Sequence, residues 1–322
     1  MRAIQIDQTG GPEVLQVADL TLKKPHSGEI RVRNHAIGVN FIDTYHRTGL
    51  YKLELPHTLG VEGAGVVEDV GPGVASFQVG DRVAYAIKTP GSYAEEINLE
   101  AQYAVKLPPE ISFETGAAMM LKGLTVEFLL RRLYIHPEPG EKILWHAAAG
   151  GVGLIACQWA KAKGIELIGT AGSREKCELA REHGAAHVID YKKEDVVARV
   201  RELTDGRGVR IVYDSVGADT WERSLDCLQP LGLMVSFGNA SGPVPPMSLL
   251  TLSQKGSLYV TRPTMFSYFA RYGSEMMTAV VDIVKSGKVK LDAPRQYPLD
   301  QAAQAHADLE ARATIGSVVL VP

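Results

Sequence analysis

The segment Ala147–Gly153 restricts the possible folds of this 322-residue chain more than any other. It reads Ala-Ala-Ala-Gly-Gly-Val-Gly, follows the apolar run Lys142–His146 and opens a segment with helical spacing. In doubly wound α/β folds, glycines stand in this turn where the backbone approaches a pyrophosphate and where the helix packs on the strand. Gly150 and Gly153 occupy these two positions. The alternative is a turn whose glycines serve packing alone.

The middle of the chain alternates between short apolar runs and helical segments. The apolar runs cover residues 142–146, 166–170, 187–190, 209–214, 232–237 and 257–260. The helical segments between them cover residues 152–163, 174–183, 194–204 and 219–228. Repeated strand–helix–strand units predict a parallel sheet covered on both faces. Six strands at this spacing predict a doubly wound Rossmann nucleotide-binding domain.

The first third of the chain, to about residue 110, has a different pattern. Valine-rich runs alternate with Gly, Pro and Asp, which is typical of short strands joined by tight turns, so we expect it to be mostly β. Gly63 and Gly65 within a strand indicate a bulge or a close approach to the backbone. Two helices are predicted over residues 265–286 and 301–311, and a strand over 317–320 that returns to complete the first domain.

Composition and charge exclude several classes of protein. Hydrophobic residues at 45% and charged residues at 22% are not the composition of a disordered chain. A net charge of −3 lacks the surplus of cations expected of a nucleic-acid-binding protein. Three widely spaced cysteines exclude a disulfide scaffold and a four-cysteine zinc site. No apolar segment has the length of a membrane helix and the N-terminus does not read as a signal peptide, so we expect a cytoplasmic protein.

The end of the second strand of the predicted Rossmann domain indicates which dinucleotide binds. NAD sites place an Asp or Glu there to hold the ribose 2′-hydroxyl, whereas this chain has Gly172. A hydroxyl and two cations follow at Ser173, Arg174 and Lys176, and they would attract a 2′-phosphate. Tyr191, after the third strand, is a candidate to flank the adenosine end. We therefore predict NADP(H), although Arg174 and Lys176 could instead be solvated residues of a first helical turn.

Further candidate cofactor-binding residues follow the later strands, because ligands of such sheets bind at the carboxyl ends of the strands. Together with those of the glycine turn (Ala147–Gly153), they are Gly150, Gly151, Val152, Gly153, Ser215, Gly217, Phe237 and Gly238. Each of the later turns taken alone is only a turn.

Taken together, these motifs resemble the medium-chain dehydrogenase/reductase superfamily, and within it the zinc-independent quinone oxidoreductases of the zeta-crystallin type. The stretches that carry the resemblance are residues 40–45, 60–65, 80–83, 123–125, 147–153 and 214–217, in the order and spacing of the family. The resemblance implies a GroES-like β-rich catalytic domain over residues 1–122 and 264–322, and a Rossmann NADP(H)-binding domain over 123–263. It also implies a site in the cleft between them, a ribose contact from Thr125, and a homodimer joined through an edge strand, for which residues 256–261 are the candidate.

The first domain departs from the zinc alcohol dehydrogenases of the superfamily. Those enzymes carry a Cys ligand in the first of these regions and Gly-His-Glu in the second, where this chain has Asn40–Asp43 and Gly60–Glu62. A single carboxylate cannot make a three-ligand zinc site, so we expect no metal. Without a Lewis acid, alcohol oxidation loses its main driving element, whereas a quinone accepts electrons readily.

The candidate catalytic residues are Asn40, Tyr45 and Tyr51, which would hydrogen-bond the cofactor or line a flat apolar pocket. Ordinary packing is the alternative for both tyrosines. Arg312 lies near the C-terminus, where a surface salt bridge is its alternative role. We predict NADPH-dependent reduction of a small-molecule quinone. The alternatives are reduction of an enone or alkenal C=C bond, and a non-enzymatic structural or RNA-binding role.

Overall fold

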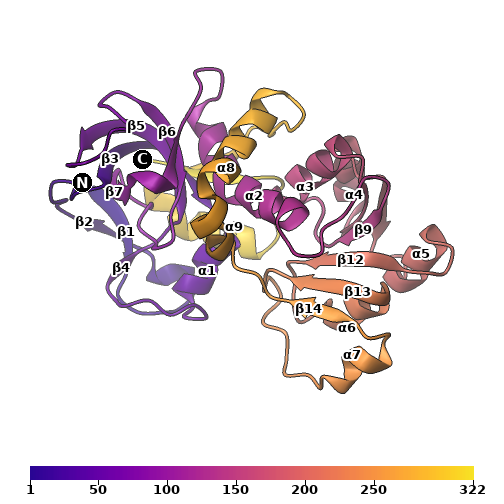
Figure 1. Ribbon diagram of the computed structural model, residues 1–322. Helices are drawn as coiled ribbons and strands as arrows, with labels where there is room; N and C mark the ends of the chain where they lie inside the picture. The colour runs from indigo at the N-terminus through magenta and orange to yellow at the C-terminus, as the bar shows by residue number, and fades with distance from the viewer. The chain divides into compact units, whose positions relative to one another are not determined.

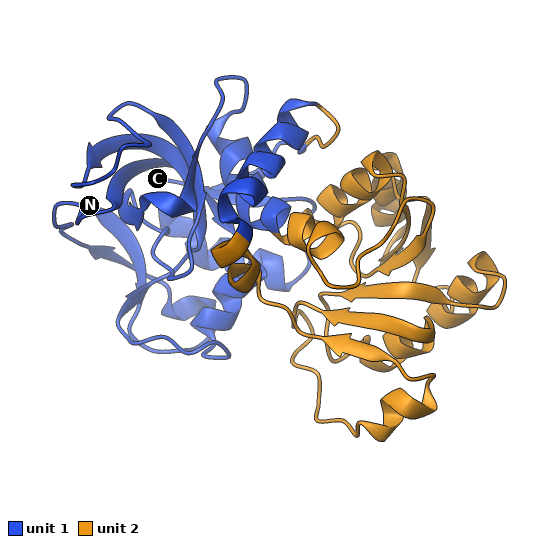
Figure 2. Cartoon of the chain, viewed as in Figure 1, with its two compact units in different colours: residues 1–124, 272–286, 291–322 blue, residues 125–271, 287–290 orange.

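The computed structural model describes residues 1–322, which form two compact units (Figure 2). Unit 1 comprises residues 1–124, 272–286 and 291–322, and unit 2 comprises residues 125–271 and 287–290. Two of the points where the chain passes between the units lie inside helices, namely α2 (Phe113–Arg131) and α8 (Met265–Lys285). No helix combines the length and hydropathy that a membrane span requires.

Unit 1 contains two β-sheets (Figure 1). The smaller sheet is antiparallel, in the order β2–β1–β4, with β1 (Arg2–Ile6), β2 (Gln16–Asp19) and β4 (His57–Thr58). The larger sheet has the order β15–β16–β3–β5–β6–β8, and β7 pairs with β3. Its strands are β3 (Glu29–Val39), β5 (Glu62–Val70), β6 (Arg82–Ala86), β7 (Glu96–Glu100), β8 (Ala104–Lys106), β15 (Arg295–Pro298) and β16 (Val318–Val321).

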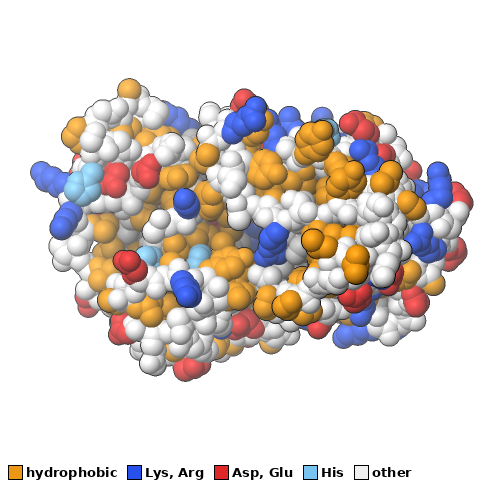
Figure 3. Space-filling model, turned by 60° about the horizontal axis from the view of Figure 1, so that its bottom comes forward, with side chains coloured by type: hydrophobic (Ala, Val, Ile, Leu, Met, Phe, Trp, Pro, Cys, Tyr) orange, Lys and Arg blue, Asp and Glu red, His pale blue; other side chains and the backbone are white.

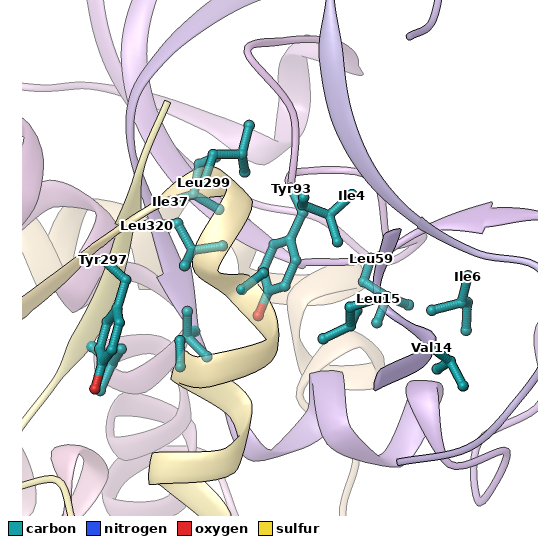
Figure 4. Packing of buried hydrophobic residues seen from close by; sticks show 14 residues of the cluster. Ile4, Ile6, Val14, Leu15, Ile37, Leu59, Tyr93, Tyr297, Leu299 and Leu320 are labelled. Atoms are coloured by element: carbon teal, nitrogen blue, oxygen red, sulfur yellow. The ribbon is translucent and has the colours of Figure 1, made fainter. Parts of the chain in front are cut away.

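The C-terminal strand returns to the first part of the chain, as predicted. Strand β16 pairs antiparallel with β3, and Val318 lies opposite Val39. Helix α9 (Ala302–Glu310) and the short 3-10 helix Leu299–Gln301 precede it. Two other 3-10 helices cover Pro12–Val14 and Ala101–Tyr103. Side chains from both ends of the chain therefore share one core in unit 1, where Ile4, Leu59 and Leu320 are among the buried residues (Figure 4).

The two glycines that indicated a bulge in the strand do mark close contacts. A Cβ at Gly65 would lie 2.8 Å from the carbonyl carbon of Arg33, and the register between β3 and β5 shifts beside it. A Cβ at Gly63 would lie 2.8 Å from Cζ of Tyr85. Glycine is needed at both positions because neighbouring atoms already fill the space of a side chain.

The expectation that residues up to about 110 are mostly β omits one helix, α1 (Phe41–Arg47). This helix spans only 7 residues, so it shows little apolar periodicity. Its start is nevertheless marked in the sequence, because Asn40 stands at the N-cap and Asp43 three residues later accepts the Asn40 N–H at 2.8 Å. An N-cap followed by an acidic residue at N3 is a recognised start signal for a helix.

Unit 2 has a six-stranded parallel sheet in the order β11–β10–β9–β12–β13–β14. This order confirms the predicted doubly wound fold. The strands are β9 (Lys142–Trp145), β10 (Glu166–Ala171), β11 (His187–Asp190), β12 (Val209–Asp214), β13 (Leu228–Ser236) and β14 (Tyr259–Thr261). The helices are α3 (Gly151–Ala162), α4 (Arg174–Glu182), α5 (Val196–Leu203), α6 (Trp221–Asp226) and α7 (Leu250–Gln254).

Candidate functional site

The glycine turn joins β9 to α3 at the carboxyl end of the sheet in unit 2. Gly150 is the N-cap of α3 and has no side chain with which to cap the helix, so the N–H groups of the first turn are left for a ligand. A Cβ at Gly153 would lie 2.5 Å from the carbonyl oxygen of Ala148, which explains glycine at this position. Gly151 and Val152 are half-buried on the same first turn. The predicted phosphate-binding residues therefore lie together around one helix N-terminus.

The start of the glycine turn is strained and held by Thr170. Ala147 has a φ of 55°, in the left-handed region that L-residues rarely adopt. The Ala147 N–H points to Oγ1 of Thr170 at 3.4 Å, and the Ala148 N–H donates to the Thr170 carbonyl at 3.0 Å. Thr170 on the neighbouring strand β10 thus fixes two successive peptide groups of the turn.

Gly172 and Tyr191 form a pair at the ends of β10 and β11. The ring of Tyr191 lies over Gly172, and a Cβ added to Gly172 would stand 2.7 Å from Cζ of the tyrosine. The Tyr191 N–H also donates to the carbonyl of Ala171 at 3.1 Å. Consequently the tyrosine ring fills the space that an acidic side chain would need at residue 172. The absence of an acid at residue 172 therefore goes together with the position of Tyr191, which occupies that space.

The three polar residues after Gly172 have local roles in helix α4. Ser173 is the N-cap, and its hydroxyl accepts the N–H of Lys176 at 3.3 Å. Arg174 is exposed, and its Nε donates to Glu178 one helical turn further on at 2.8 Å. Lys176 is half-buried in the first turn. These contacts bring Ser173, Arg174 and Lys176 together at the N-terminus of α4, next to Gly172.

The turns after β12 and β13 lie against each other. Oδ1 of Asp214 accepts the N–H groups of Val216 at 2.7 Å and Gly217 at 3.0 Å. A Cβ at Gly238 would lie 2.8 Å from Cα of Ser215, so these two backbones are in contact. The half-buried Phe237 packs on Trp145 with 5.4 Å between ring centroids. The structure therefore brings together the four cofactor candidates of these two turns.

In unit 1, the side chain of Asn40 is held by a buried ion pair. Its Nδ2 donates to Oε1 of Glu62 at 2.7 Å, and Nζ of Lys122 lies 2.9 Å from the same oxygen. The other oxygen of Glu62 accepts the N–H of Leu121 at 2.7 Å. Glu62 is fully buried and Lys122 is 5% exposed. With its three donors, Glu62 is satisfied within the protein.

A second buried network extends from Asp43 to the surface. Tyr93 donates its hydroxyl proton to Oδ2 of Asp43 at 3.0 Å and lies 3.0 Å from Nε2 of His306. Nη1 of Arg47 lies 3.0 Å from the other nitrogen of His306, and Nη2 donates to both oxygens of Glu310 at 2.8 and 3.0 Å. Burial raises the pKa of Asp43 to about 7 and lowers the pKa of His306 to about 3. Because Arg47 can only donate, His306 accepts from it and donates to Tyr93.

Four further site candidates are Tyr45, Tyr51, Thr125 and Arg312. Tyr45 and Tyr51 are in edge contact, with 5.3 Å between ring centroids, and Tyr45 is buried. Thr125 is half-buried on α2 and is the first residue of unit 2. Arg312 is exposed just after α9, with a φ of 58°.

Several polar residues described above were not singled out from the sequence. They are Tyr93, Lys122, Thr170 and His306. One signal was available: Lys122 interrupts the apolar run Ala117–Leu124, and a lysine there requires a buried partner. The others are ordinary polar residues until the fold brings their partners close.

Two protein-family models match parts of this chain. Residues 26–109 match the family described as alcohol dehydrogenase GroES-like domain, and residues 151–286 match that described as zinc-binding dehydrogenase. The chain is 55% identical over its full length to a quinone oxidoreductase of Pseudomonas aeruginosa, of which it covers 99%. The chain belongs to the quinone oxidoreductases of the medium-chain dehydrogenase/reductase superfamily.

Solved structures and a further relative extend the comparison. A quinone oxidoreductase of Escherichia coli, solved as a complex with NADPH, has a TM-score of 0.97 and 52% identity, with full coverage of both chains. A 2-haloacrylate reductase of Burkholderia is 41% identical over 99% of this chain and 98% of its own length. Members of the superfamily thus share this framework while their names record different substrates.

The second family description implies a zinc ion, which the residues of this quinone oxidoreductase do not fit. Lys122 and Asn40 both point donor groups at Oε1 of Glu62, and an ammonium group there would repel a metal cation. No group of three or more His, Cys, Asp and Glu side chains lies close enough to hold a metal ion. No step of the chemistry is therefore assigned to zinc.

Proposed function

We propose that this protein reduces quinones with NADPH. The observation that carries the proposal is the similarity, over the full length of both chains, to the E. coli quinone oxidoreductase solved with NADPH. NADPH, when bound, supplies the hydride, and a proton from the surroundings completes the hydroquinone.

In this proposal, unit 2 binds the cofactor. The N-terminus of α3, with Gly150, Gly151, Val152 and Gly153, receives the pyrophosphate. Ser173, Arg174, Lys176 and Tyr191 surround the 2′-phosphate, since Gly172 carries no acid to repel it. Ser215, Gly217, Phe237, Gly238 and Thr125 of the same unit are assigned to the rest of the cofactor. Arg312 belongs to unit 1, and its assignment to the cofactor stays a prediction from the sequence.

We assign the quinone side of the reaction to unit 1. Tyr45 and Tyr51 offer flat apolar rings with hydroxyl tips that suit a quinone. Asn40 is held from behind by Glu62, so its amide is oriented before any ligand binds. These residues position the quinone and exclude water, and no covalent step is needed.

The test is oxidation of NADPH, and separately of NADH, at a fixed enzyme concentration with 1,4-benzoquinone and with a 2-alkenal. Turnover with NADPH and benzoquinone is the expected result. Turnover of the alkenal with benzoquinone inert would move the function to C=C reduction, the kind of bond that a haloacrylate contains. A preference for NADH would contradict the assignment of the 2′-phosphate site.

We further propose a homodimer joined through β14. This strand ends the sheet of unit 2 and has no partner on its outer side, and Tyr259 and Val260 are 53% and 40% exposed. An apolar edge of this kind favours strand pairing with a second copy. Light scattering is expected to give a dimer for the natural chain and a monomer for Val260→Lys. A monomer for the natural chain would contradict the proposal.

The cytoplasm is the proposed location, and small molecules rather than nucleic acids are the proposed partners. All three cysteines are unpaired and buried, which suits a reducing compartment. On the face shown in Figure 3, basic and acidic side chains are interspersed and form no continuous basic stripe.

A further inference from the structure

A buried chain of hydrogen bonds lies beneath the glycine turn of unit 2 and includes four side chains. Oδ2 of Asp214 accepts the hydroxyl of Ser224 at 2.8 Å, and Ser224 Oγ lies 2.9 Å from Nε2 of His146. The other ring nitrogen, Nδ1 of His146, lies 3.0 Å from Oγ1 of Thr170. We call Asp214, Ser224, His146 and Thr170 the His146 chain. None of them is more than 5% exposed.

Counting donors gives the direction of every bond in the His146 chain. The Asp214 carboxylate accepts four: two backbone N–H groups on Oδ1, and the hydroxyls of Thr220 and Ser224 on Oδ2. Because Ser224 gives its only proton to Asp214, its oxygen must accept from Nε2–H of His146. Burial lowers the pKa of His146, although Asp214 opposes this effect, so the ring carries no second proton. The imidazole is therefore neutral and its Nδ1 is an acceptor.

The same counting continues to the glycine turn. Since Nδ1 of His146 accepts, Thr170 gives it the hydroxyl proton and keeps its Oγ1 lone pairs for the N–H of Ala147 at 3.4 Å. Ala147 is the residue in the left-handed region, with a φ of 55°. A strained residue of this kind persists only where its surroundings hold it in place. The chain therefore begins at the turn after β12 and ends on the strained peptide that opens the glycine turn.

We propose that the His146 chain positions the glycine turn for the pyrophosphate of NADPH, with neutral His146 as its central positioning residue. The His146 chain connects two turns at the carboxyl end of one sheet, the glycine turn and Asp214–Gly217, and fixes their positions relative to each other. The inference rests on the proposed binding of NADPH.

The first experiment compares two buried threonines of the same unit. Thr170→Val removes the acceptor of Ala147 N–H and the donor to His146. Thr204→Val is the matched control, because Thr204 is 4% exposed and also makes two hydrogen bonds. Its hydroxyl accepts the Gly208 N–H at 2.9 Å and donates to the Val200 carbonyl at 2.7 Å. Thr204 precedes the amino end of β12, whereas the glycine turn lies at the carboxyl end of the sheet. Both variants are expected to lose about the same thermal stability. Thr170→Val raises the Kd of NADPH about tenfold, measured by fluorescence titration, and Thr204→Val leaves it within about twofold.

The second experiment needs no cofactor and reads the direction of the bonds. Long-range proton–nitrogen NMR of protein with labelled histidine is expected to show Nε2–H on His146, with the signal assigned by its loss in His146→Asn. Asp214→Asn places an N–H₂ group against Ser224 and Thr220, so Ser224 must donate the other way. His146 then changes to the Nδ1–H tautomer.

The outcomes separate this inference from the proposed function. Nδ1–H in the natural protein, or no change of tautomer in Asp214→Asn, overturns the one-way chain. Equal Kd values for the two threonine variants overturn the positioning role, since the loss of a bond would then act on stability alone. Failure of the natural protein to bind NADPH would instead overturn the proposed cofactor and leave the tautomer result standing.

Discussion

The pair formed by Gly172 and Tyr191 leads to a specific prediction about cofactor preference. An acid at residue 172 is the feature that would be expected to favour NADH, because it would bind a ribose 2′-hydroxyl and repel a 2′-phosphate. In this chain the acid cannot simply be added, since a Cβ at 172 would lie 2.7 Å from Cζ of Tyr191. We therefore expect Gly172→Asp alone to weaken binding of both cofactors. Only Gly172→Asp combined with Tyr191→Ala is expected to prefer NADH.

The magnitude follows from the position of the new charge. Two unit charges 4 Å apart interact by ~1 kcal/mol in water and ~4 kcal/mol at the effective dielectric near a protein surface. Residue 172 is half-buried, and a 2′-phosphate carries more than one charge. The carboxylate should therefore cost NADPH about 2–4 kcal/mol, or roughly 30- to 1000-fold in Kd. The displaced tyrosine ring affects both cofactors and accounts for the weak binding of NADH by the single variant.

The assay is kcat/KM for NADPH and NADH with benzoquinone, for the natural protein, the two single variants and the double variant. Tyr191→Ala is the control for loss of the ring without an added charge. If Gly172→Asp alone gives an enzyme that prefers NADH, the ring moves aside freely and the steric argument is wrong. If NADPH binding is unchanged in both variants that carry Gly172→Asp, the 2′-phosphate does not lie at this strand end.

Three predictions concern the networks of unit 1. Burial raises the pKa of Asp43 from 3.8 to about 7, so the folded protein holds a proton that the unfolded chain has already lost. The free energy of unfolding is therefore highest below about pH 4 and falls by up to roughly 4 kcal/mol as the pH rises to about 7. Asp43→Asn should abolish this slope, measured by urea unfolding. Lys122→Met leaves the buried Glu62 carboxylate without its cation and should cost about 3–5 kcal/mol of stability. The double variant Lys122→Met with Glu62→Gln should recover most of this loss. Equal stability of the single and double variants would contradict the ion pair. Glu310→Gln removes the charge that faces the buried Arg47. Since the Glu310 side chain is itself 35% exposed, the loss should cost about 2 kcal/mol and lower Tm by roughly 3 °C. An effect that vanishes in ~1 M salt would identify an ordinary surface pair.

Local sequence signals predicted the elements of unit 2 well. The glycine turn, with the apolar run before it and the helical spacing after it, located β9 and α3 to within one residue at each end. Strand β13 begins at Leu228, four residues earlier than the apolar run from 232 suggested, and β14 is shifted to Tyr259–Thr261. In both cases pairing with a neighbouring strand decides the bounds, and the hydrophobic pattern does not contain that information.

The polar networks could not be predicted because their members are far apart in the sequence. Thr170 and Ser224 are separated by 24 and 78 residues from His146, yet they lie within hydrogen-bond distance of it. Read alone, each is an ordinary polar residue near the end of an element. The strand order brings them together, because the end of β9 lies between the ends of β10 and β12. Sequence motifs located the backbone that we propose binds the cofactor, whereas the side chains that contact this backbone required the fold.

The helices α2 and α8 limit how this protein can be recombined with its relatives. Residues 124 and 125, and likewise 271 and 272, belong to different units but to one helix. A chimaera that exchanges one unit must therefore be spliced inside a helix, where no loop absorbs a change of length. One inserted residue rotates every side chain beyond the splice by about 100° around the helix axis. Exchange of units is thus expected to succeed between relatives with α2 and α8 of equal length, and to fail where either differs by a single residue.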